Sequence, residues 1–419
     1  MTLPTPQLSA QAIEAALQRL QGIARRTPLE LNATLSAQYD CEVWLKREDL
    51  QVVRSYKLRG AYNKMASLNA AEKAAGIVCA SAGNHAQGVA FSCRQLRIRG
   101  RIFMPTTTPQ QKVGKVATFG GEWVETVLTG DTYDDANAAA QDYCQQQRAV
   151  FIHPFDDHQI IEGQATVGAE ILEQAGFSPD FLFLPVGGGG LAAGVSTYFR
   201  EKSPQTAVVG VEPAGAAAMK ISIANGFNTT LDDIDRFVDG AAVKRVGDKT
   251  FAICRQNLYD VITIPEGKVC ATILKLYNEE AIVAEPAGAL AIAALEQYRP
   301  HIRGKKVVCV VSGGNNDISR TEEIRERALL YEGLKHYFII RFPQRAGALK
   351  TFVVNVLGPD DDIAHFEYIK KNNREAGPAL VGIEFKQTGQ LERLQDHLRQ
   401  YNFNFEYLNG NSDLLRFLL

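Results

Sequence analysis

The chain has 419 residues, of which 46% are hydrophobic and 22% are charged, and its formal net charge is −2. This length is too great for one ordinary core, so the sequence predicts two or three domains of a soluble globular protein. A nearly neutral charge balance without a basic block argues against binding to nucleic acid or to a membrane surface.

The cysteines and the apolar runs indicate the cellular compartment in which the protein folds. The 7 cysteines are scattered without a CxxC pair, which argues against a disulfide scaffold or a zinc cluster and favours buried thiols in a reducing cytoplasm. Residues 1–6 lack the features of a signal peptide, and no apolar run approaches the ~20 residues that a membrane-spanning helix needs. We therefore expect a cytoplasmic protein without a membrane segment.

Short apolar runs alternate with helical patterns along most of the chain. The first pattern predicts a helix over 9–21 with Ser9 as its N-cap. The predicted strands that follow are 42–46, 76–80, 101–105, 122–126, 149–153, 181–186, 207–212, 260–264 and 306–311. The predicted helices are 57–68, 85–96, 110–119, 131–147, 158–175, 190–201, 266–279, 286–297 and 321–332. This alternation indicates an α/β fold with a mainly parallel sheet, which binds ligands at the carboxyl ends of its strands.

Lys57 lies at the junction of a predicted strand and a predicted helix, in the stretch Arg54–Gly60. Inside a cleft, burial and the neighbouring cations Arg54 and Arg59 would disfavour the ammonium form of this lysine. A lysine with a lowered pKa can act as a nucleophile and form a Schiff base with a carbonyl. On this stretch alone, an ordinary solvated surface lysine remains the alternative.

Three loops rich in small residues follow predicted strands. The loop Ser81–Gly88 opens a helix whose free N–H groups favour an anion such as a carboxylate, although Asn84 could simply cap that helix. Four successive glycines in Gly187–Leu191 cost conformational entropy, which a phosphate held by backbone N–H groups would justify. The loop Ser312–Asn316 offers a hydroxyl that can hydrogen-bond a ring nitrogen, or it is an ordinary β-to-α turn. The missing GxGxxG and GxxxxGK[ST] patterns argue against dinucleotide and P-loop sites.

The pattern changes after residue 325. Strands are expected over 337–342, 363–370, 380–385 and 403–407, with helices from 343 to about 356 and over 391–401. This β-α-β-β-α-β order is typical of a ferredoxin-like α+β domain. The sequence therefore predicts a linker at 326–335 and a further domain over 336–410.

Taken together, the four motifs resemble one family. The lysine in SYKLRG, the SAGNHAQG loop, the tetraglycine loop and the terminal SGGN are similar in order to those of the fold type II pyridoxal-phosphate β-eliminases, specifically the biosynthetic threonine dehydratases. The resemblance implies a tryptophan synthase β-like catalytic domain over 1–325, made of two open twisted α/β subdomains with the smaller, roughly 47–150, inserted in the larger. The stretch Pro343–Leu349 resembles the ACT-like regulatory domain of the same enzymes, in a short form with one such domain per chain.

The resemblance also implies roles for individual residues. Lys57 would carry pyridoxal 5'-phosphate and later take the α-proton of the substrate. Asn84 would hydrogen-bond the ring hydroxyl of the cofactor, and Ser312 would face its pyridine nitrogen. The phosphate would be held by Gly187, Gly188, Gly189, Gly190 and Leu191, and the loop that receives the substrate carboxylate would include Ser81, Gly83 and His85.

The implied activity is that of a threonine ammonia-lyase, which converts L-threonine to 2-oxobutanoate and ammonia as the first step of isoleucine biosynthesis, with L-serine as a poorer substrate. The resemblance further implies inhibition by isoleucine, relief by valine and a homotetramer. A serine dehydratase or serine racemase remains an alternative. A non-catalytic amino-acid sensor built on the ACT-like domain is a further alternative, from a different functional class.

Two acidic positions are ambiguous. Glu285, before Pro286, resembles the family's motif near the cofactor ring, but the same pattern is an ordinary helix start. Glu212 occupies the region where related serine racemases bind a divalent cation. There Ala216–Ala218 stand where a second acid is required, which argues against a metal site and against a racemase.

Overall fold

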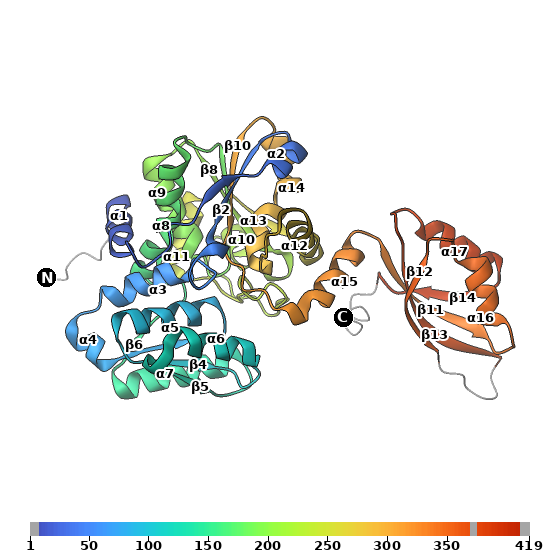
Figure 1. The fold of residues 1–419 in the computed structure, drawn as a ribbon, viewed down its shortest axis with the longest axis horizontal. Coiled ribbons are helices and arrows are strands. Elements are labelled where there is room, and N and C mark those ends of the chain that lie inside the picture. Colours follow the sequence, from blue (N-terminus) through green and yellow to red (C-terminus); the bar gives the residue numbers. More distant parts are fainter. Residues whose placement is uncertain (1–7, 369–374, 411–419) are drawn as a thin grey trace. The chain divides into compact units, whose positions relative to one another are not determined.

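The computed structural model describes residues 8–368 and 375–410, and it divides the chain into two compact units. The first unit is Met1–Glu266 with Glu279–Asn316, and the second is Gly267–Asn278 with Asp317–Leu419. Figure 1 shows the elements of each unit along the chain. No helix among the described residues is both long enough and apolar enough to cross a membrane.

A six-stranded sheet forms the centre of the first unit. Its order is β1 (Leu29–Leu31), β2 (Glu42–Arg47), β10 (Lys306–Val311), β7 (Phe181–Pro185), β8 (Ala207–Pro213) and β9 (Asp260–Ile264). All neighbours pair in parallel except the edge strand β1, which is antiparallel to β2. The predicted parallel α/β architecture is thus confirmed. The edge strand was not predicted because three residues are too few to show an alternating pattern.

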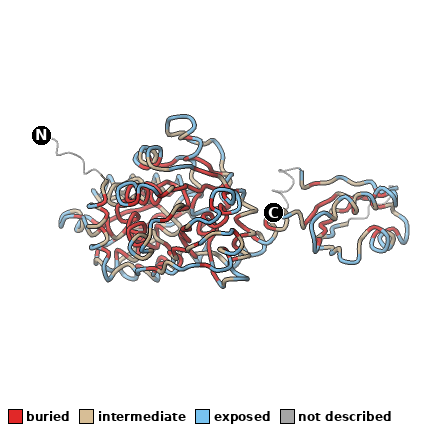
Figure 2. The backbone as a smooth tube through the Cα atoms, turned by 90° about the horizontal axis from the view of Figure 1, so that it is seen from above, coloured by how far each residue is buried: buried red, intermediate tan, exposed pale blue. Residues whose placement is uncertain are grey.

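Helices cover both faces of this sheet. On one face, α8 (His158–Ala175) and α9 (Gly190–Lys202) share an apolar core with alternate sheet residues such as Val308 and Val310. On the other face lies α13 (Pro286–Ala293), where Cys309 Sγ donates to the carbonyl of Ala291 at 3.5 Å. Burial on both faces explains the continuous apolar runs of the central strands. Figure 2 shows buried residues, in red, throughout the interior of the first unit.

Two of the remaining helices of the first unit begin at side-chain caps. Ser9 caps α1 (Ala10–Arg19) as predicted, since its side chain accepts from the N–H of Ala12. Asn32 likewise caps α2 (Ala33–Tyr39), whereas α10 (Ala218–Asn225), α11 (Asp248–Asn257) and α14 (Leu295–Ile302) begin without a side-chain cap. Most of α12 (Glu266–Glu280) belongs to the second unit. The prediction missed α2, α10 and α11, and it joined α13 to the start of α14.

A second, four-stranded parallel sheet lies in the same unit. Its order is β5 (Val124–Leu128), β4 (Gly100–Met104), β3 (Ile77–Ala80) and β6 (Val150–Phe151). One face packs with α3 (Lys57–Ala66), α5 (Asn84–Leu96) and α6 (Gln110–Gly120), and the other with α7 (Tyr133–Gln147). The short α4 (Ala70–Ala75), which begins at a capping box of Asn69 and Glu72, was not predicted.

The second unit contains an antiparallel sheet. Its order is β12 (Asp362–Tyr368), β13 (Ala376–Glu384), β11 (Lys335–Pro343) and β14 (Asn404–Tyr407). The core residues of its strands pack against α16 (Ala348–Thr351), its π-helical continuation Phe352–Val356, and α17 (Leu391–Gln400). The predicted ferredoxin-like order is confirmed, although the last residues of the strand expected at 363–370 lie outside the described residues. The first half of the linker expected at 326–335 belongs to α15 (Thr321–Tyr331). The expected domain bounds, 1–325 and 336–410, stay a prediction.

Candidate active site

Lys57 is the first residue of α3, at the strand-to-helix junction where the sequence places it. Its Nζ donates to the carbonyl oxygen of Pro154 at 3.0 Å. Protein surrounds the amine, and this burial lowers the pKa of Lys57 to about 8, although the nearby carboxylate of Glu285 opposes the shift. A larger share of neutral amine is therefore present near neutral pH than in an ordinary exposed lysine.

The first and last motifs meet directly at Lys57. The N–H of Tyr56 donates to the carbonyl of Ser312 at 3.3 Å, and Ser55 forms an isolated antiparallel bridge with Gly313. The hydroxyl of Ser312 is buried and makes one long contact of 3.4 Å to the carbonyl of Ala287. Such a hydroxyl remains available to a ring nitrogen.

The SAGNHAQG loop lies against the same helix. A Cβ on Gly88 would come within 2.9 Å of the backbone nitrogen of Leu58, so only glycine allows α5 to approach the start of α3 this closely. Ser81, Gly83 and Asn84 are partly exposed at the beginning of α5, where the first N–H groups of a helix point outward to an anion.

His85 differs from the other residues of this loop. Its side chain is buried, and its Nε2 lies 2.8 Å from the carbonyl oxygen of Ile152. A carbonyl only accepts, so Nε2 carries the hydrogen. Burial, followed by the charge of Lys57, lowers the pKa of His85 to about 3. The neutral ring therefore has no second N–H to donate, so the backbone N–H is the group that His85 could offer to a carboxylate on this loop.

The tetraglycine loop joins β7 to α9 and has no room for side chains. Gly189 has a φ of +93°. A Cβ on Gly188 would lie 2.1 Å from the ring of Phe155, and one on Gly190 would lie 2.3 Å from Gln164 Oε1. This loop can therefore offer only backbone N–H groups, the arrangement suited to a phosphate.

The loop after β6 connects Lys57 to the tetraglycine loop, and sequence reasoning missed it. The carbonyl of Pro154 accepts from Lys57 and, at 3.2 Å, from Gln164 Nε2. The ring of the next residue, Phe155, covers Gly188. This loop also follows the carboxyl end of a parallel strand, which was the one available signal, but it contains no glycine.

Glu285 lies inside the site and does not cap its helix. It stands at the N-cap position of α13 without a side-chain capping bond. Its Oε1 instead accepts from Asn84 Nδ2 at 2.6 Å, and its Oε2 accepts from the N–H of Asn315 at 3.3 Å. Burial, together with the charge of Asp239, raises the pKa of Glu285 to about 7. An ordinary helix start therefore does not explain the position and contacts of Glu285.

Glu212 has structural partners. Its two oxygens accept from the N–H groups of Met219 at 2.7 Å and Lys220 at 2.8 Å, at the start of α10. Burial raises the pKa of Glu212 to about 7. Within residues 8–368 and 375–410, no group of three or more His, Cys, Asp or Glu side chains is placed to hold a metal ion.

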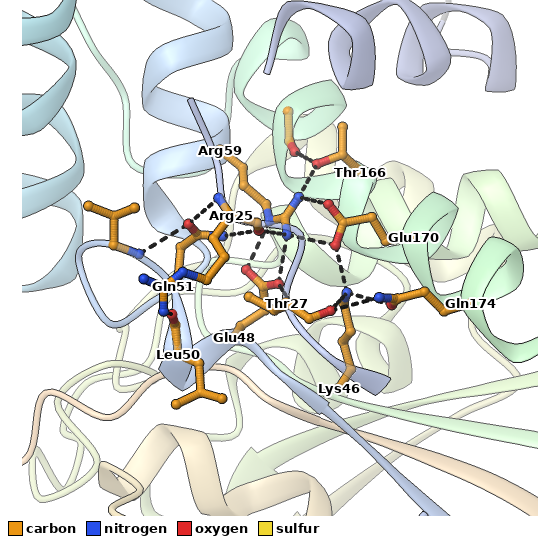
Figure 3. A network of polar contacts seen from close by, with 12 residues as sticks. Arg25, Thr27, Lys46, Glu48, Leu50, Gln51, Arg59, Thr166, Glu170 and Gln174 are labelled. Carbon is orange, nitrogen blue, oxygen red and sulfur yellow. Dashed lines mark hydrogen bonds and ion pairs between the residues drawn. The ribbon is translucent and has the colours of Figure 1, made fainter. Parts of the chain in front are cut away.

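A buried charge network supports the helix that begins at Lys57 (Figure 3). Arg59 pairs with Glu48 at 2.8 Å and with Glu170 at 2.7 Å, and Lys46 pairs with Glu170 at 2.6 Å. The expected influence of Arg54 and Arg59 on Lys57 was wrong, since neither contributes to its pKa shift. Arg59 is instead neutralised by its two carboxylate partners.

Parallel α/β layers, a buried lysine at a strand-to-helix junction and a backbone-lined phosphate loop define a pyridoxal-phosphate-dependent enzyme of fold type II. Residues 20–313 match the family of pyridoxal-phosphate-dependent enzymes, and residues 326–418 match the C-terminal regulatory domain of threonine dehydratase. The chain is 55% identical over 412 residues to a biosynthetic L-threonine dehydratase of Halalkalibacterium halodurans, covering 98% of this chain and 99% of that protein. The chain belongs to the biosynthetic threonine dehydratases within this enzyme family.

Solved structures of similar proteins cover about three quarters of the chain. Threonine deaminase isoform 2 of Solanum lycopersicum, in its processed form, is 39% identical with a TM-score of 0.71, over 76% of this chain and 94% of that chain. Maize serine racemase is 27% identical with a TM-score of 0.71, over 77% of this chain and 98% of that chain. Both likenesses agree with the fold type II architecture described above.

Replacing Glu285 by Gln is expected to flatten the pH dependence of stability. The pKa of Glu285 is about 7 in the folded protein and 4.5 in its ordinary state, so the folded protein holds an extra proton between these values. Its unfolding free energy therefore falls as the pH rises from about 4.5 to about 7, by roughly 3 kcal/mol for the full shift.

The measurement is urea unfolding of the cofactor-stripped protein at pH 5 and pH 7.5. We expect the loss of unfolding free energy between the two pH values to be smaller in E285Q than in the wild type. Glu212, whose pKa is also raised, stays in both proteins, so it cancels from the comparison. Identical losses in the two proteins would contradict a buried, proton-binding Glu285.

Proposed function

We propose that this chain is a threonine ammonia-lyase, which converts L-threonine to 2-oxobutanoate and ammonia with pyridoxal 5'-phosphate and accepts L-serine less well. The observation that carries the proposal is Lys57, with its enclosed amine and lowered pKa, beside the loops that carry the other motifs. The similarity to L-threonine dehydratases over nearly the whole chain supports threonine as the substrate.

The residues present fit the cofactor. A Cβ at Gly188 or Gly190 would fill the cradle at the start of α9, and backbone N–H groups there suit a phosphate. The hydroxyl of Ser312 suits a ring nitrogen, and Asn84 suits a ring hydroxyl. Among the described residues, the buried hydroxyl of Ser55 has no hydrogen-bond partner, as expected beside a polar group that the fold is built to receive.

The chain's own residues perform binding and proton transfer. Pyridoxal phosphate, when bound, takes up the negative charge that develops at the substrate α-carbon. Lys57 holds the cofactor and, once its amine is free, acts as the base that takes the α-proton. The first N–H groups of α5, beside Ser81 and Gly83, receive the substrate carboxylate. Ser312, being neutral, does not force a proton onto the ring nitrogen.

The test is an assay for 2-oxobutanoate after L-threonine is added to the purified, cofactor-loaded protein. Rapid formation of the keto acid supports the lyase. No keto acid with the cofactor demonstrably bound would reject it and direct attention to a serine racemase, which analysis of D-serine detects. Binding of amino acids without any bound cofactor would instead indicate a sensor.

The second unit supports regulation by an amino-acid end product. It has the ferredoxin-like order, and residues 326–418 match a regulatory domain of threonine dehydratase. We propose isoleucine as the inhibitor and valine as the ligand that relieves it, in a cytoplasmic homotetramer. Equal activity with and without isoleucine would contradict the proposed inhibition. Sedimentation of the holoenzyme measures the number of subunits.

Replacing Gly189 by Ala is expected to weaken pyridoxal-phosphate binding by at least about tenfold. Its φ is +93°, and a Cβ there would lie 2.9 Å from Met219 Cε and from Thr250 Cβ. The strained backbone costs about 1–3 kcal/mol unless the loop shifts, and a shift moves the N–H groups away from the phosphate. Fluorescence titration with the cofactor measures the change in Kd.

Gly226→Ala is the matched control. Gly226 has a similar φ of +79°, ends α10, and has open space where a Cβ would lie. This control variant should lose stability through backbone strain but keep the cofactor Kd of the wild type. Equal cofactor affinity in the two variants would contradict a phosphate site at the tetraglycine loop.

A further inference from the structure

Asn315 lies in the loop after β10 and reaches the side chain of Asn84, which begins α5. Its Nδ2 donates to Asn84 Oδ1 at 2.7 Å and to the carbonyl oxygen of Val53 at 2.9 Å. We propose that Asn315 is a positioning residue that fixes the amide of Asn84 as a hydrogen-bond donor toward the cofactor. This inference rests on the proposed function, in which Asn84 contacts the ring hydroxyl.

The orientation of the Asn315 amide follows from its neighbours. The carbonyl oxygen of Val53 can only accept a hydrogen bond, so the amide nitrogen of Asn315 must face it. On the other side, Lys115 Nζ lies 3.2 Å from Asn315 Oδ1, and an ammonium group can only donate. Both neighbours therefore select the same one of the two possible amide orientations.

This orientation determines that of Asn84. One hydrogen of Asn315 Nδ2 serves Val53 and the other points to Asn84, so the atom of Asn84 that faces it must be the oxygen. The amide nitrogen of Asn84 then lies on the far side, where one hydrogen is given to Glu285 Oε1 at 2.6 Å. The second hydrogen is available to an acceptor in the site.

The consequence concerns the charge of the ring oxygen. A donor at Asn84 favours an ionised ring oxygen, because a hydrogen bond to the charged form of a group stabilises that form. If Asn84 turned its amide over, its oxygen would face the cofactor and would favour the protonated ring oxygen instead. The visible absorption of the bound cofactor reports this proton, so the positioning role has a readout that does not depend on turnover.

The experiment measures cofactor Kd and the visible absorption spectrum in Asn315→Asp, Asn315→Leu, Asn84→Ala and the double variants of Asn84→Ala with each Asn315 change. Neither Asp nor Leu can donate to Asn84. We expect each single Asn315 variant to weaken binding of pyridoxal phosphate about tenfold, a typical value for one lost hydrogen bond, and to change the absorption band in the same direction. In the Asn84→Ala background, neither change at position 315 should have a further effect.

Three outcomes would overturn the inference. Equal losses of affinity in both backgrounds would mean that Asn315 acts through general packing or charge. An unchanged Kd and spectrum in the single variants would mean that Asn84 needs no positioning. Wild-type affinity and spectrum in Asn84→Ala would show that Asn84 does not contact the cofactor, so Asn315 would have no contact to position. Threonine turnover by that variant would still support the proposed function. Failure of the wild type to bind pyridoxal phosphate would instead reject the proposed function itself.

Discussion

Replacing Lys57 by Ala is expected to lower the rate of 2-oxobutanoate formation from L-threonine by at least about 10⁴-fold. The variant loses the amine that holds the cofactor and the base that takes the α-proton, and a positioned base alone contributes roughly 10²–10⁴-fold. The fold should survive, because among the described residues the Lys57 side chain makes a single hydrogen bond, to the carbonyl of Pro154.

The measurement pairs the activity assay with borohydride reduction, which links a lysine-bound cofactor permanently to the chain. We expect the wild type to keep the cofactor after denaturation and K57A to lose it. A circular dichroism spectrum like that of the wild type would exclude unfolding as the cause.

Lys64→Ala is the matched control for this variant. Lys64 lies on the same helix α3, but its ammonium group pairs with the carboxylate of Asp157 at 2.8 Å and not with the carbonyl that binds Lys57. Loss of the Lys64 side chain should leave the rate of 2-oxobutanoate formation within a few-fold of that of the wild type. Comparable rates for K57A and K64A would contradict the assignment of Lys57 as the reacting lysine.

The parts of the site that the sequence predicted are those with local signals. Four glycines before a helix and a lysine between a strand and a helix are readable within about ten residues, and the structure places them at one edge of the sheets as parallel α/β topology requires. Their partners have no local signal. Asn84 meets Glu285 across 201 positions of sequence, and Pro154 reaches Lys57 through a carbonyl that any residue could supply.

The lack of a local signal for distant partners also explains the wrong expectation that Arg59 lowers the pKa of Lys57. Two positions from Lys57, it was expected to repel the ammonium group, because sequence proximity was the only information on its surroundings. One of its partners, Glu170, lies 111 positions further along the chain. A helical pattern at 158–175 predicts α8, but it does not predict which of its polar residues turns inward. Pairing of this kind is decided by packing between elements.

Replacing Arg59 by Met is expected to lower the unfolding free energy by about 3–5 kcal/mol. Arg59, Glu48 and Lys46 are fully buried, and Glu170 is nearly so. Burial alone would raise the pKa of Glu48, but the guanidinium of Arg59, together with Lys46 and the hydroxyl of Thr27, holds that pKa below its ordinary value. Without Arg59, two carboxylates share the single cation Lys46, and breaking a buried pair costs about this much. Urea unfolding measures the loss.

Arg26→Met is the matched control. Arg26 pairs at 3.2 Å with Glu173, which lies on α8 like Glu170, but both side chains are more than half exposed. An exposed ion pair of this kind contributes about 0–1 kcal/mol. Similar losses in R59M and R26M would show that burial of the network does not matter.

A second substitution distinguishes uncompensated charge from lost packing in R59M. In the wild type, Glu48→Gln removes a carboxylate from a balanced set of two cations and two anions, and it should destabilise the protein because Arg59 loses a partner. In R59M the same substitution restores balance, since only the pair of Lys46 and Glu170 remains charged. Glu48→Gln should therefore destabilise the wild type and stabilise R59M. The same sign in both backgrounds would mean that the cost of R59M comes from the lost volume and hydrogen bonds of Arg59, with the charges screened even in this buried site.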